Sequence, residues 1–213
     1  MEKKDLLKDV IKHIDIKSYD STQLVDAMRN MSFTSRDTAR AADILMMMCK
    51  EKECTNILTL AGSTSAAGCM QVYVDMVRNK MIDVVVATGA SIIDMDLFEA
   101  LGYKHYIGEK ENVIPDTTLR DLYIDRIYDT YIDEEELQAC DHSTYELANM
   151  LEARPYSSRE FIYEIGKWLH NGKAVKKDSL IQTCYECGVP IFVPAFSDSS
   201  AGFGIGKHQW ERM

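Results

Sequence analysis

The sequence has no apolar run of about 20 residues, the length that a membrane-spanning helix needs, and its first residues, Met1 to Asp5, hold no apolar core of a signal peptide. It also has no excess of basic residues. With 24 Lys and Arg against 34 Asp and Glu, its formal net charge of −10 argues against binding to the phosphates of nucleic acids. We therefore expect a cytoplasmic protein that has neither a membrane nor a nucleic acid as its partner.

Metal-ligand spacing is missing too. The six cysteines include one close pair, Cys184 and Cys187, and neither a second pair nor a His-x-His sequence accompanies it, so a zinc site is only weakly supported. The sequence shows no repeat, low-complexity tract or linker. We expect one domain over residues 1–213, which is long enough to bury a sizeable core.

What the chain does contain is a strand–helix–strand–helix unit between Asn56 and Leu101. Its two apolar runs, residues 57–61 and 82–87, have the length of buried strands, and a helical pattern follows each of them. Parallel strands require such helical crossovers. With a further strand at 190–193, the pattern predicts an α/β fold: a Rossmann-like parallel sheet flanked by helices, with a helical N-terminal region.

The remaining segments give weaker patterns. Residues 109–121 are polar, hold Pro115 and are expected to form a loop. A lone histidine among aromatic residues, His105, is expected to be packed rather than catalytic. Further helices are expected over residues 5–13, from Thr22, from Thr34, from Asp133, from Ser157 to Leu169 and over residues 178–187.

Small residues follow both strands of the central unit, directly before the next helix. Ligands of open α/β sheets bind at the carboxyl ends of the strands, and a helix that begins near Ala66 would turn its N–H groups and positive dipole end toward the loop. That arrangement suits a phosphate or pyrophosphate. The loop matches neither Gly-x-Gly-x-x-Gly nor a Walker motif, so two interpretations stay open: a nucleotide site, or glycines that only allow tight turns.

Several separated stretches resemble the deoxyhypusine synthase family, and they occur in the family's order. They are Leu58 to Gly68, residues 79–90, Asp96-Leu97-Phe98, residues 154–161 and residues 189–198. The resemblance spans essentially the whole chain and is nearer to the bacterial deoxyhypusine-synthase-like or homospermidine-synthase-like branch than to the eukaryotic enzyme. In that family, substantial sequence follows the position of Met213 and carries the nucleophilic lysine, so we expect the C-terminal part to be lacking here.

The resemblance implies an NAD-dependent enzyme that transfers an aminobutyl group from a spermidine-like polyamine to an acceptor amine. The acceptor is a protein lysine in hypusine formation and a small diamine in homospermidine formation. It also implies a homotetramer with active sites between subunits. The cofactor contacts that it implies are Gly62, Ser63, Thr64, Thr88, Gly89, Ala90 and Asp198, with the carboxylate of Asp198 accepting ribose hydroxyls.

The substrate side departs from the family pattern. Where eukaryotic members have two adjacent glutamates, Asp94 is expected to keep one acidic role, and Asp96 is expected to cap or solvate its helix. Phe203 stands where a further family aspartate would be. No lysine, Lys207 included, matches the nucleophile, so we assign no catalytic residue and expect this span alone not to complete the transfer. Two alternatives remain: a catalytically inactive relative that acts as a binding or regulatory subunit, and an unrelated nucleotide-binding α/β protein.

Overall fold

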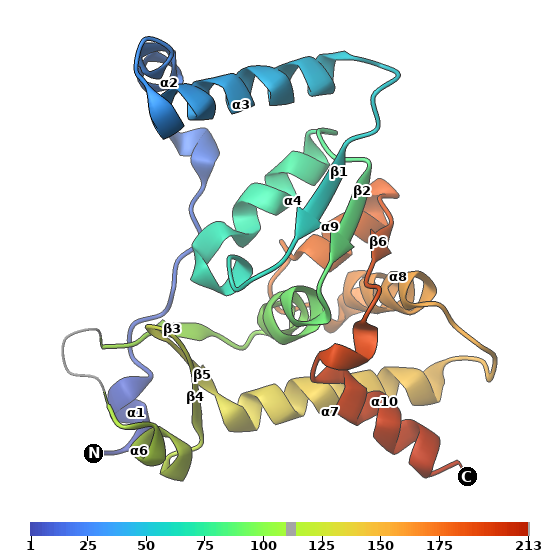
Figure 1. Cartoon of the computed structure of the whole chain (residues 1–213). Coiled ribbons are helices and arrows are strands. Elements are labelled where there is room, and N and C mark those ends of the chain that lie inside the picture. Colours follow the sequence, from blue (N-terminus) through green and yellow to red (C-terminus); the bar gives the residue numbers. More distant parts are fainter. Residues whose placement is uncertain (110–113, 213) are drawn as a thin grey trace.

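A computed structural model describes residues 1–109 and 114–212. Its centre is a parallel sheet with the strand order β1-β2-β6 (Figure 1). The strands are β1 (Ile57–Leu60), β2 (Val84–Ala87) and β6 (Ile191–Phe192). Ile57 pairs with Val84, and Val85 pairs with Ile191. The three strands predicted from the apolar runs are these three, and the predicted α/β fold class is confirmed.

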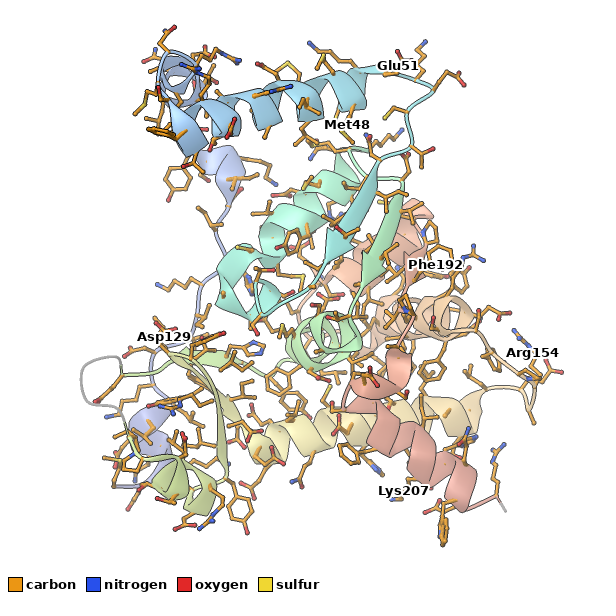
Figure 2. All side chains as sticks on the ribbon, viewed as in Figure 1. Met48, Glu51, Asp129, Arg154, Phe192 and Lys207 are labelled. Atoms are coloured by element: carbon orange, nitrogen blue, oxygen red, sulfur yellow. The ribbon has the colours of Figure 1, made fainter. Side chains whose placement is uncertain are left out.

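The two faces of this sheet differ. Leu60, Val85 and Ile191 are buried on one face, in a core that they share with apolar residues of α4 (Met70–Arg78) and α9 (Leu180–Cys187). Side chains alternate across a strand, and on the opposite face Ile57 is 54% and Phe192 40% exposed. Figure 2 labels Phe192 beside the sheet. The helices of the central unit therefore cover one face more fully than the other.

The two crossovers begin with irregular helical turns. The first is η2 (Ser65–Cys69), which is broken at Gly68, where φ is 98°. Regular α4 starts only at Met70, so the helix predicted near Ala66 begins four residues later, after a glycine in a left-handed conformation. The second, η3 (Ala90–Leu97), continues into α5 (Phe98–Ala100) and matches the predicted helix at 92–101.

A second, antiparallel sheet of order β3-β5-β4 lies beside the first (Figure 1). Its strands are β3 (His105–Ile107), β4 (Ile124–Ile127) and β5 (Thr130–Asp133), and α6 (Asp116–Asp121) precedes β4. The predicted loop at 109–121 is therefore wrong where α6 lies, because Leu119 is buried with Leu6 and Ile124 in a small core. Residues 110–113 of that prediction lie outside the described residues.

The predicted N-terminal helix at 5–13 is also wrong in most of its length. Only α1 (Lys3–Leu6) is helical. Val10 instead forms an antiparallel bridge with Tyr106, and the N–H of Ile11 donates to the carbonyl of His105 at 2.9 Å. The edge of β3 offers this segment backbone partners, and these long-range hydrogen bonds outweigh the local helical pattern.

The C-terminal half is mainly helical. It comprises α7 (Glu134–Met150), α8 (Ser158–Trp168), η4 (Leu169–Lys173), α9, η5 (Phe196–Asp198) and α10 (Ala201–Trp210). Ser157 and Glu160 form a capping box at the start of α8, the helix predicted from Ser157. Helix α9 ends at Gly188, directly after the predicted range 178–187, and φ of Gly188 is 72°. Helix α10 crosses α7 closely (Figure 1), since a Cβ on Gly204 would overlap Thr144.

Two helices stand apart from the sheets: α2 (Thr22–Met28) and α3 (Phe33–Lys50) (Figure 1). They are the helices predicted from Thr22 and Thr34, and we name them the arm; the two sheets with α4 to α10 form the body. The η1 turn (Ile16–Ser18) precedes the arm. In α3 only Ala39 is buried. Within the described ranges, no helix has the length and apolar character that crossing a membrane takes.

Candidate cofactor and substrate site

Three turns that leave the parallel strands meet at the carboxyl edge of the sheet. The hydroxyl of Ser91 donates to the carbonyl of Gly62 at 3.2 Å, which joins the turn after β1 to the turn after β2. A Cβ on Gly89 would lie 2.6 Å from the Cβ of Ser199, which brings the turn after β6 against the same place. The sequence-predicted residues Gly62 to Thr64, Thr88 to Ala90 and Asp198 therefore lie on adjacent turns.

The first turn leaves room for a ligand. Gly62 has φ of 72°, and a Cβ built on it would meet nothing within 4 Å. Gly62 and Thr64 are exposed, and Ser63 is half-buried. The hydroxyl of Tyr73 donates to that of Thr64 at 2.8 Å, so the turn is fixed while its backbone stays open. The space beside Gly62 is therefore open to a ligand that lies along this edge.

The second turn is more closely packed. Thr88 is exposed, and its hydroxyl lies 2.9 Å from that of Ser91. Because Ser91 donates to Gly62, Thr88 donates to Ser91. Gly89 is buried and its open side is filled by Ser199, so glycine is needed here for packing against the third turn. Thr88 and the half-buried Ala90 remain the groups of this turn that a ligand can reach.

Asp198 ends η5, at the rim of the same edge. Its side chain is exposed, whereas the neighbouring Ser199 is buried and donates its hydroxyl to the carbonyl of Phe196 at 2.8 Å. The Ser199 contact fixes the turn, and the carboxylate of Asp198 is left at the surface. A carboxylate in this position can accept two hydroxyl donors, which suits a ribose.

The predicted substrate residue Asp94 lies on η3 and faces the start of α10. The hydroxyl of Ser200 donates to Asp94 Oδ1 at 2.6 Å, and the Ser200 N–H donates to the same oxygen at 3.2 Å. The Ser200 hydroxyl also contacts Oδ1 of Asp141, on α7. A hydroxyl has one proton to donate, so the second carboxylate contact requires a carboxyl proton.

Burial raises the pKa of Asp141 to about 6, against the hydrogen bond from Ser200, and the charge of Asp94 adds to the rise. Burial likewise raises the pKa of Asp94, against its hydrogen bonds from Ser200. The pair therefore holds a proton more readily than isolated carboxylates do. A cationic ligand that displaces this proton would relieve the repulsion between the two charges.

Asp141 was not predicted. It lies inside the acid-rich helix α7, whose charges have the pattern of a solvated face, and no local signal separates it from its neighbours. It also lines a cleft of about 380 Å³ with Tyr145, Phe203 and Lys207, among others. The ammonium of Lys207 lies 4.5 Å from the centre of the Tyr145 ring, so this lysine rests on α7.

The expectation that Asp96 caps or solvates its own helix is wrong. It is buried, and its two carboxylate oxygens accept the N–H groups of Leu180 and Ile181 at 2.8 and 2.7 Å. It therefore caps the start of α9 rather than its own helix, and it is not solvated. His105 is packed as predicted, with its ring centre 5.1 Å from that of Phe98.

The six cysteines, Cys184 and Cys187 among them, are free thiols. Among the residues that the structure describes, no three His, Cys, Asp or Glu side chains are grouped so that they could hold a metal ion.

Comparison with known proteins gives a consistent result. The family described as Deoxyhypusine synthase matches residues 23–213. A deoxyhypusine synthase-like protein of Caulobacter vibrioides is 65% identical over 212 residues, which are 100% of this chain and 57% of the relative. A deoxyhypusine synthase-like protein of Coxiella burnetii is 60% identical over 97% of this chain and 58% of its own length.

The fold has a solved counterpart. The crystal structure of a chain described as a deoxyhypusine synthase, from Entamoeba histolytica, superposes with a TM-score of 0.61 at 20% identity, over 94% of this chain and 70% of that one. At this identity the likeness concerns the fold. The chain spans little more than half the length of its bacterial relatives, and the family match covers most of it: the chain belongs to the deoxyhypusine synthase family.

Proposed function

We propose that this chain forms the NAD-binding part of an NAD-dependent aminobutyl transferase that acts on a spermidine-like polyamine. The observation that carries the proposal is the meeting of three strand-end turns at one edge of a parallel sheet, in a member of the deoxyhypusine synthase family. The cofactor would supply oxidation of the polyamine by accepting a hydride. A cytoplasmic location and a protein lysine or small diamine as the acceptor are parts of the same proposal.

The cofactor half rests on the chain's own residues. The open backbone at Gly62 to Thr64 and the hydroxyl of Thr88 would contact the dinucleotide, and Asp198 would accept the ribose hydroxyls. Ala90, which a ligand can reach, would contact the cofactor as well, whereas Gly89 would support it indirectly, since Gly89 packs on Ser199.

Calorimetric titration with NAD tests this half. Asp198→Ala is expected to weaken NAD binding by roughly 10- to 100-fold, because hydrogen bonds to a charged group contribute about 1.5–3 kcal/mol. Asp37→Ala, which removes an exposed carboxylate from the arm, is the matched control and should leave the affinity unchanged. If both variants bind NAD as the unmodified chain does, Asp198 does not hold the ribose.

The substrate half rests on Asp94 and Asp141. Their shared contact with Ser200 brings two partly buried carboxylates together, and a polyamine ammonium could take the place of the proton between them. The cleft of about 380 Å³ beside Asp141 offers space for the chain of such an amine. An acidic chain of net charge −10 also suits a cationic ligand.

Spermidine binding should depend on pH with a definite sign. Because the folded pKa of Asp141 is raised to about 6, the carboxyl is neutral below this pH and charged above it. Spermidine affinity is therefore expected to fall by about tenfold from pH 7 to pH 5. Asp141→Asn should bind weakly at both values and so flatten the profile, whereas the exposed control Glu152→Gln should keep it. An unchanged profile in Asp141→Asn would remove Asp141 from the site.

A second candidate, a catalytically inactive binding or regulatory subunit, is favoured by one observation. Phe203, which replaces a family aspartate, is 78% exposed beside Asp141 in the cleft, so an apolar ring stands where a charge would attract the amine. An assay with NAD and labelled spermidine separates the two candidates. The C-terminal portion of the Caulobacter relative, supplied as a separate polypeptide, should restore product formation only if this chain is catalytically competent.

Self-association belongs to the same proposal. The arm exposes large apolar side chains, including Leu24, Phe33 and Met47, and such surfaces commonly mark contacts between proteins. Light scattering during size-exclusion chromatography would give the oligomer size, for which we propose a homotetramer.

A further inference from the structure

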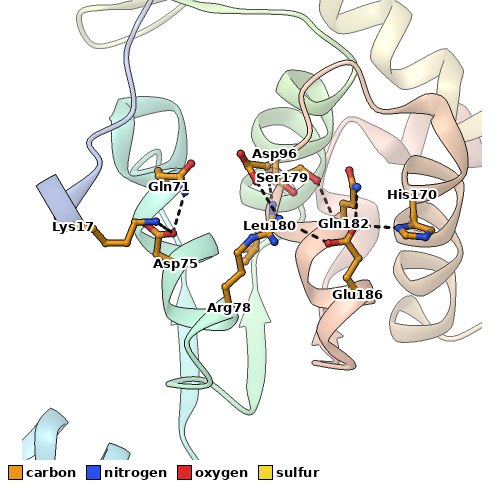
Figure 3. Close-up of polar contacts among 11 residues, drawn as sticks. Lys17, Gln71, Asp75, Arg78, Asp96, His170, Ser179, Leu180, Gln182 and Glu186 are labelled. Atoms are coloured by element: carbon orange, nitrogen blue, oxygen red, sulfur yellow. Dashed lines mark hydrogen bonds and ion pairs between the residues drawn. The ribbon is translucent and has the colours of Figure 1, made fainter.

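The segment between α1 and the arm, residues 9–17, is held against the body, and we name it the strap (Figure 1). The N–H of Ile107 donates to the carbonyl of Asp9 at 2.7 Å, and the N–H of Ile14 donates to that of Gly68 at 2.9 Å. The ammonium of Lys17 lies 2.7 Å from Asp75 on α4. Figure 3 shows Lys17 reaching across to Asp75. The strap thus joins the antiparallel sheet, the first crossover and α4.

His13, in the middle of the strap, caps helix α4. Its Nδ1 accepts the N–H of Met70 at 3.2 Å, and Met70 is the first residue of α4. The first N–H groups of a helix have no partner within it, and the N-cap residue Cys69 supplies no side-chain hydrogen bond. An imidazole from a distant segment therefore takes the place of an N-cap side chain.

The other ring nitrogen of His13 reaches a buried carboxylate. His13 Nε2 lies 2.6 Å from Glu99 Oε2. Because Nδ1 accepts a backbone N–H, the proton of the neutral ring is on Nε2, where it is donated to Glu99. One side chain therefore bridges the start of α4 and the end of the second crossover, where Glu99 lies on α5.

Glu99 is a firm anchor for this bridge. It is only 8% exposed. Its carboxylate also accepts hydrogen bonds from His105 Nδ1 at 2.9 Å and from the ammonium of Lys176 at 2.6 Å. Burial acts to raise the pKa of Glu99, but the hydrogen bonds from His105 and His13 and the charge of Lys176 outweigh it and hold the pKa well below its usual range. Removing one donor from a buried carboxylate is costly, so the position of His13 is well defined.

The same bridge reaches the first cofactor turn. The N–H of Ala67 donates to the carbonyl of Ser63 at 2.9 Å, and the N–H of Cys69 donates to that of Thr64 at 3.0 Å. Between them, Gly68 has φ of 98°, and a Cβ there would lie 3.0 Å from the carbonyl of Lys12 in the strap. The cofactor turn is therefore hydrogen-bonded to the segment from Ala67 to Cys69. This segment is in turn held in place by the strap and by His13.

We propose that His13 is a positioning residue for the cofactor turn, because it fixes the start of α4 to Glu99 and so sets the backbone from Gly62 to Met70. The ligand part of this inference rests on the proposed NAD function; the positioning part rests on the hydrogen bonds alone. His13 itself lies behind the turn and would not touch the cofactor.

Two conservative variants each keep one of the two hydrogen bonds that the His13 ring makes. The amide oxygen of Asn can occupy the place of Nδ1 and keep the cap on Met70, whereas the longer Gln reaches Glu99 and loses the cap. Hydrogen exchange followed by mass spectrometry, on peptides that cover residues 62–70 and 84–87, is measured for His13→Asn, His13→Gln and His13→Ala. His170→Gln, at an exposed histidine of η4, is the matched control.

We expect exchange over residues 62–70 to rise about fivefold in His13→Gln and His13→Ala, which corresponds to the loss of one cap. It should rise by less in His13→Asn, which keeps the cap on Met70 but loses the bond to Glu99, and it should stay at the unmodified rate in the control; exchange over β2 should not change. NAD affinity is expected to fall in the same order, by about fivefold in His13→Gln and His13→Ala and by less in His13→Asn. Unchanged exchange over 62–70, or an equal rise over β2, would overturn the positioning role. An unmodified chain that binds no NAD would overturn the proposed function, while the exchange data would still decide the role of His13.

Discussion

Helix α3 of the arm has 18 residues and buries one side chain, Ala39, whereas helix α4 of the body has nine residues and buries Met70, Val74, Asp75 and Val77. Both helices carry an apolar pattern. The difference comes from what surrounds them, because α4 lies on the sheet, whereas α3, among the described elements, packs mainly against α2 (Figure 1). Most helical stability comes from packing of the apolar face rather than from propensity.

The comparison shows where the stability of the described structure lies. In the arm, Met47 is 60% exposed and Phe33 is 88% exposed with φ of 56°, a backbone conformation that is unfavourable for a bulky residue. The body has a continuous core and helix caps. The body should therefore resist unfolding by itself, and the arm should gain its order from a contact with another molecule.

The largest difference in the free energy of unfolding is expected between two phenylalanine variants, one in the body and one in the arm. Phe98→Ala, which empties a fully buried site in the core, should destabilise the body by about 3–5 kcal/mol. Phe33→Ala, in the arm, should change the free energy of unfolding by less than about 0.5 kcal/mol. Urea denaturation, followed by circular dichroism, measures both. Similar losses in the two variants would mean that the arm is part of the same cooperative core.

The parallel sheet could be predicted because its signals are local. Three apolar runs lie between clear stops, such as Gly188 after α9, and their lengths suit buried strands. The turns after β1 and β2 could be predicted for the same reason, since Gly62 and Gly89 each come two residues after the end of their strand. The carboxyl edge of a parallel sheet then places these turns together without further information.

The antiparallel sheet could not be predicted, because its turn has no usual signal. Tyr128, between β4 and β5, has φ of 54°, whereas short hairpins normally place Gly or Asn in such a conformation. Val10 and Asp141 are similar cases. Their contacts, with Tyr106 and with Ser200, join segments far apart in the sequence, and their local patterns indicate a helix and a solvated face.

A smaller effect is expected for a carboxylate in each region. Asp96→Ala removes two acceptors from buried N–H groups at the start of α9 and should cost about 2 kcal/mol at pH 5. Burial raises the folded pKa of Asp96 to about 6, against the hydrogen bonds from Ile181 and Leu180. The folded state therefore favours the protonated carboxyl, and the stability that this preference contributes is present below the unfolded pKa and is lost as pH rises through about 6. The cost of Asp96→Ala should therefore be smaller at pH 7.5.

Asp37→Ala in the arm is the matched change, and it should alter the free energy of unfolding by less than about 0.5 kcal/mol at either pH. Urea denaturation at pH 5 and pH 7.5 measures both variants. A cost for Asp96→Ala that grows toward pH 7.5 would contradict the raised pKa.

The smallest expected difference concerns two serines, each at the N-cap of a helix. Ser157 accepts the N–H of Glu160 at 3.2 Å in the capping box of α8, whereas Ser32 precedes α3 without a side-chain cap bond. Ser157→Ala should therefore cost about 1 kcal/mol, and Ser32→Ala should cost less than about 0.3 kcal/mol. The urea concentrations at the midpoints of unfolding, compared at an unchanged m-value, measure both costs. Equal losses of stability in the two variants would mean that Ser32 caps the start of α3 in solution. The arm would then be stabilised by a helix cap, as α8 of the body is.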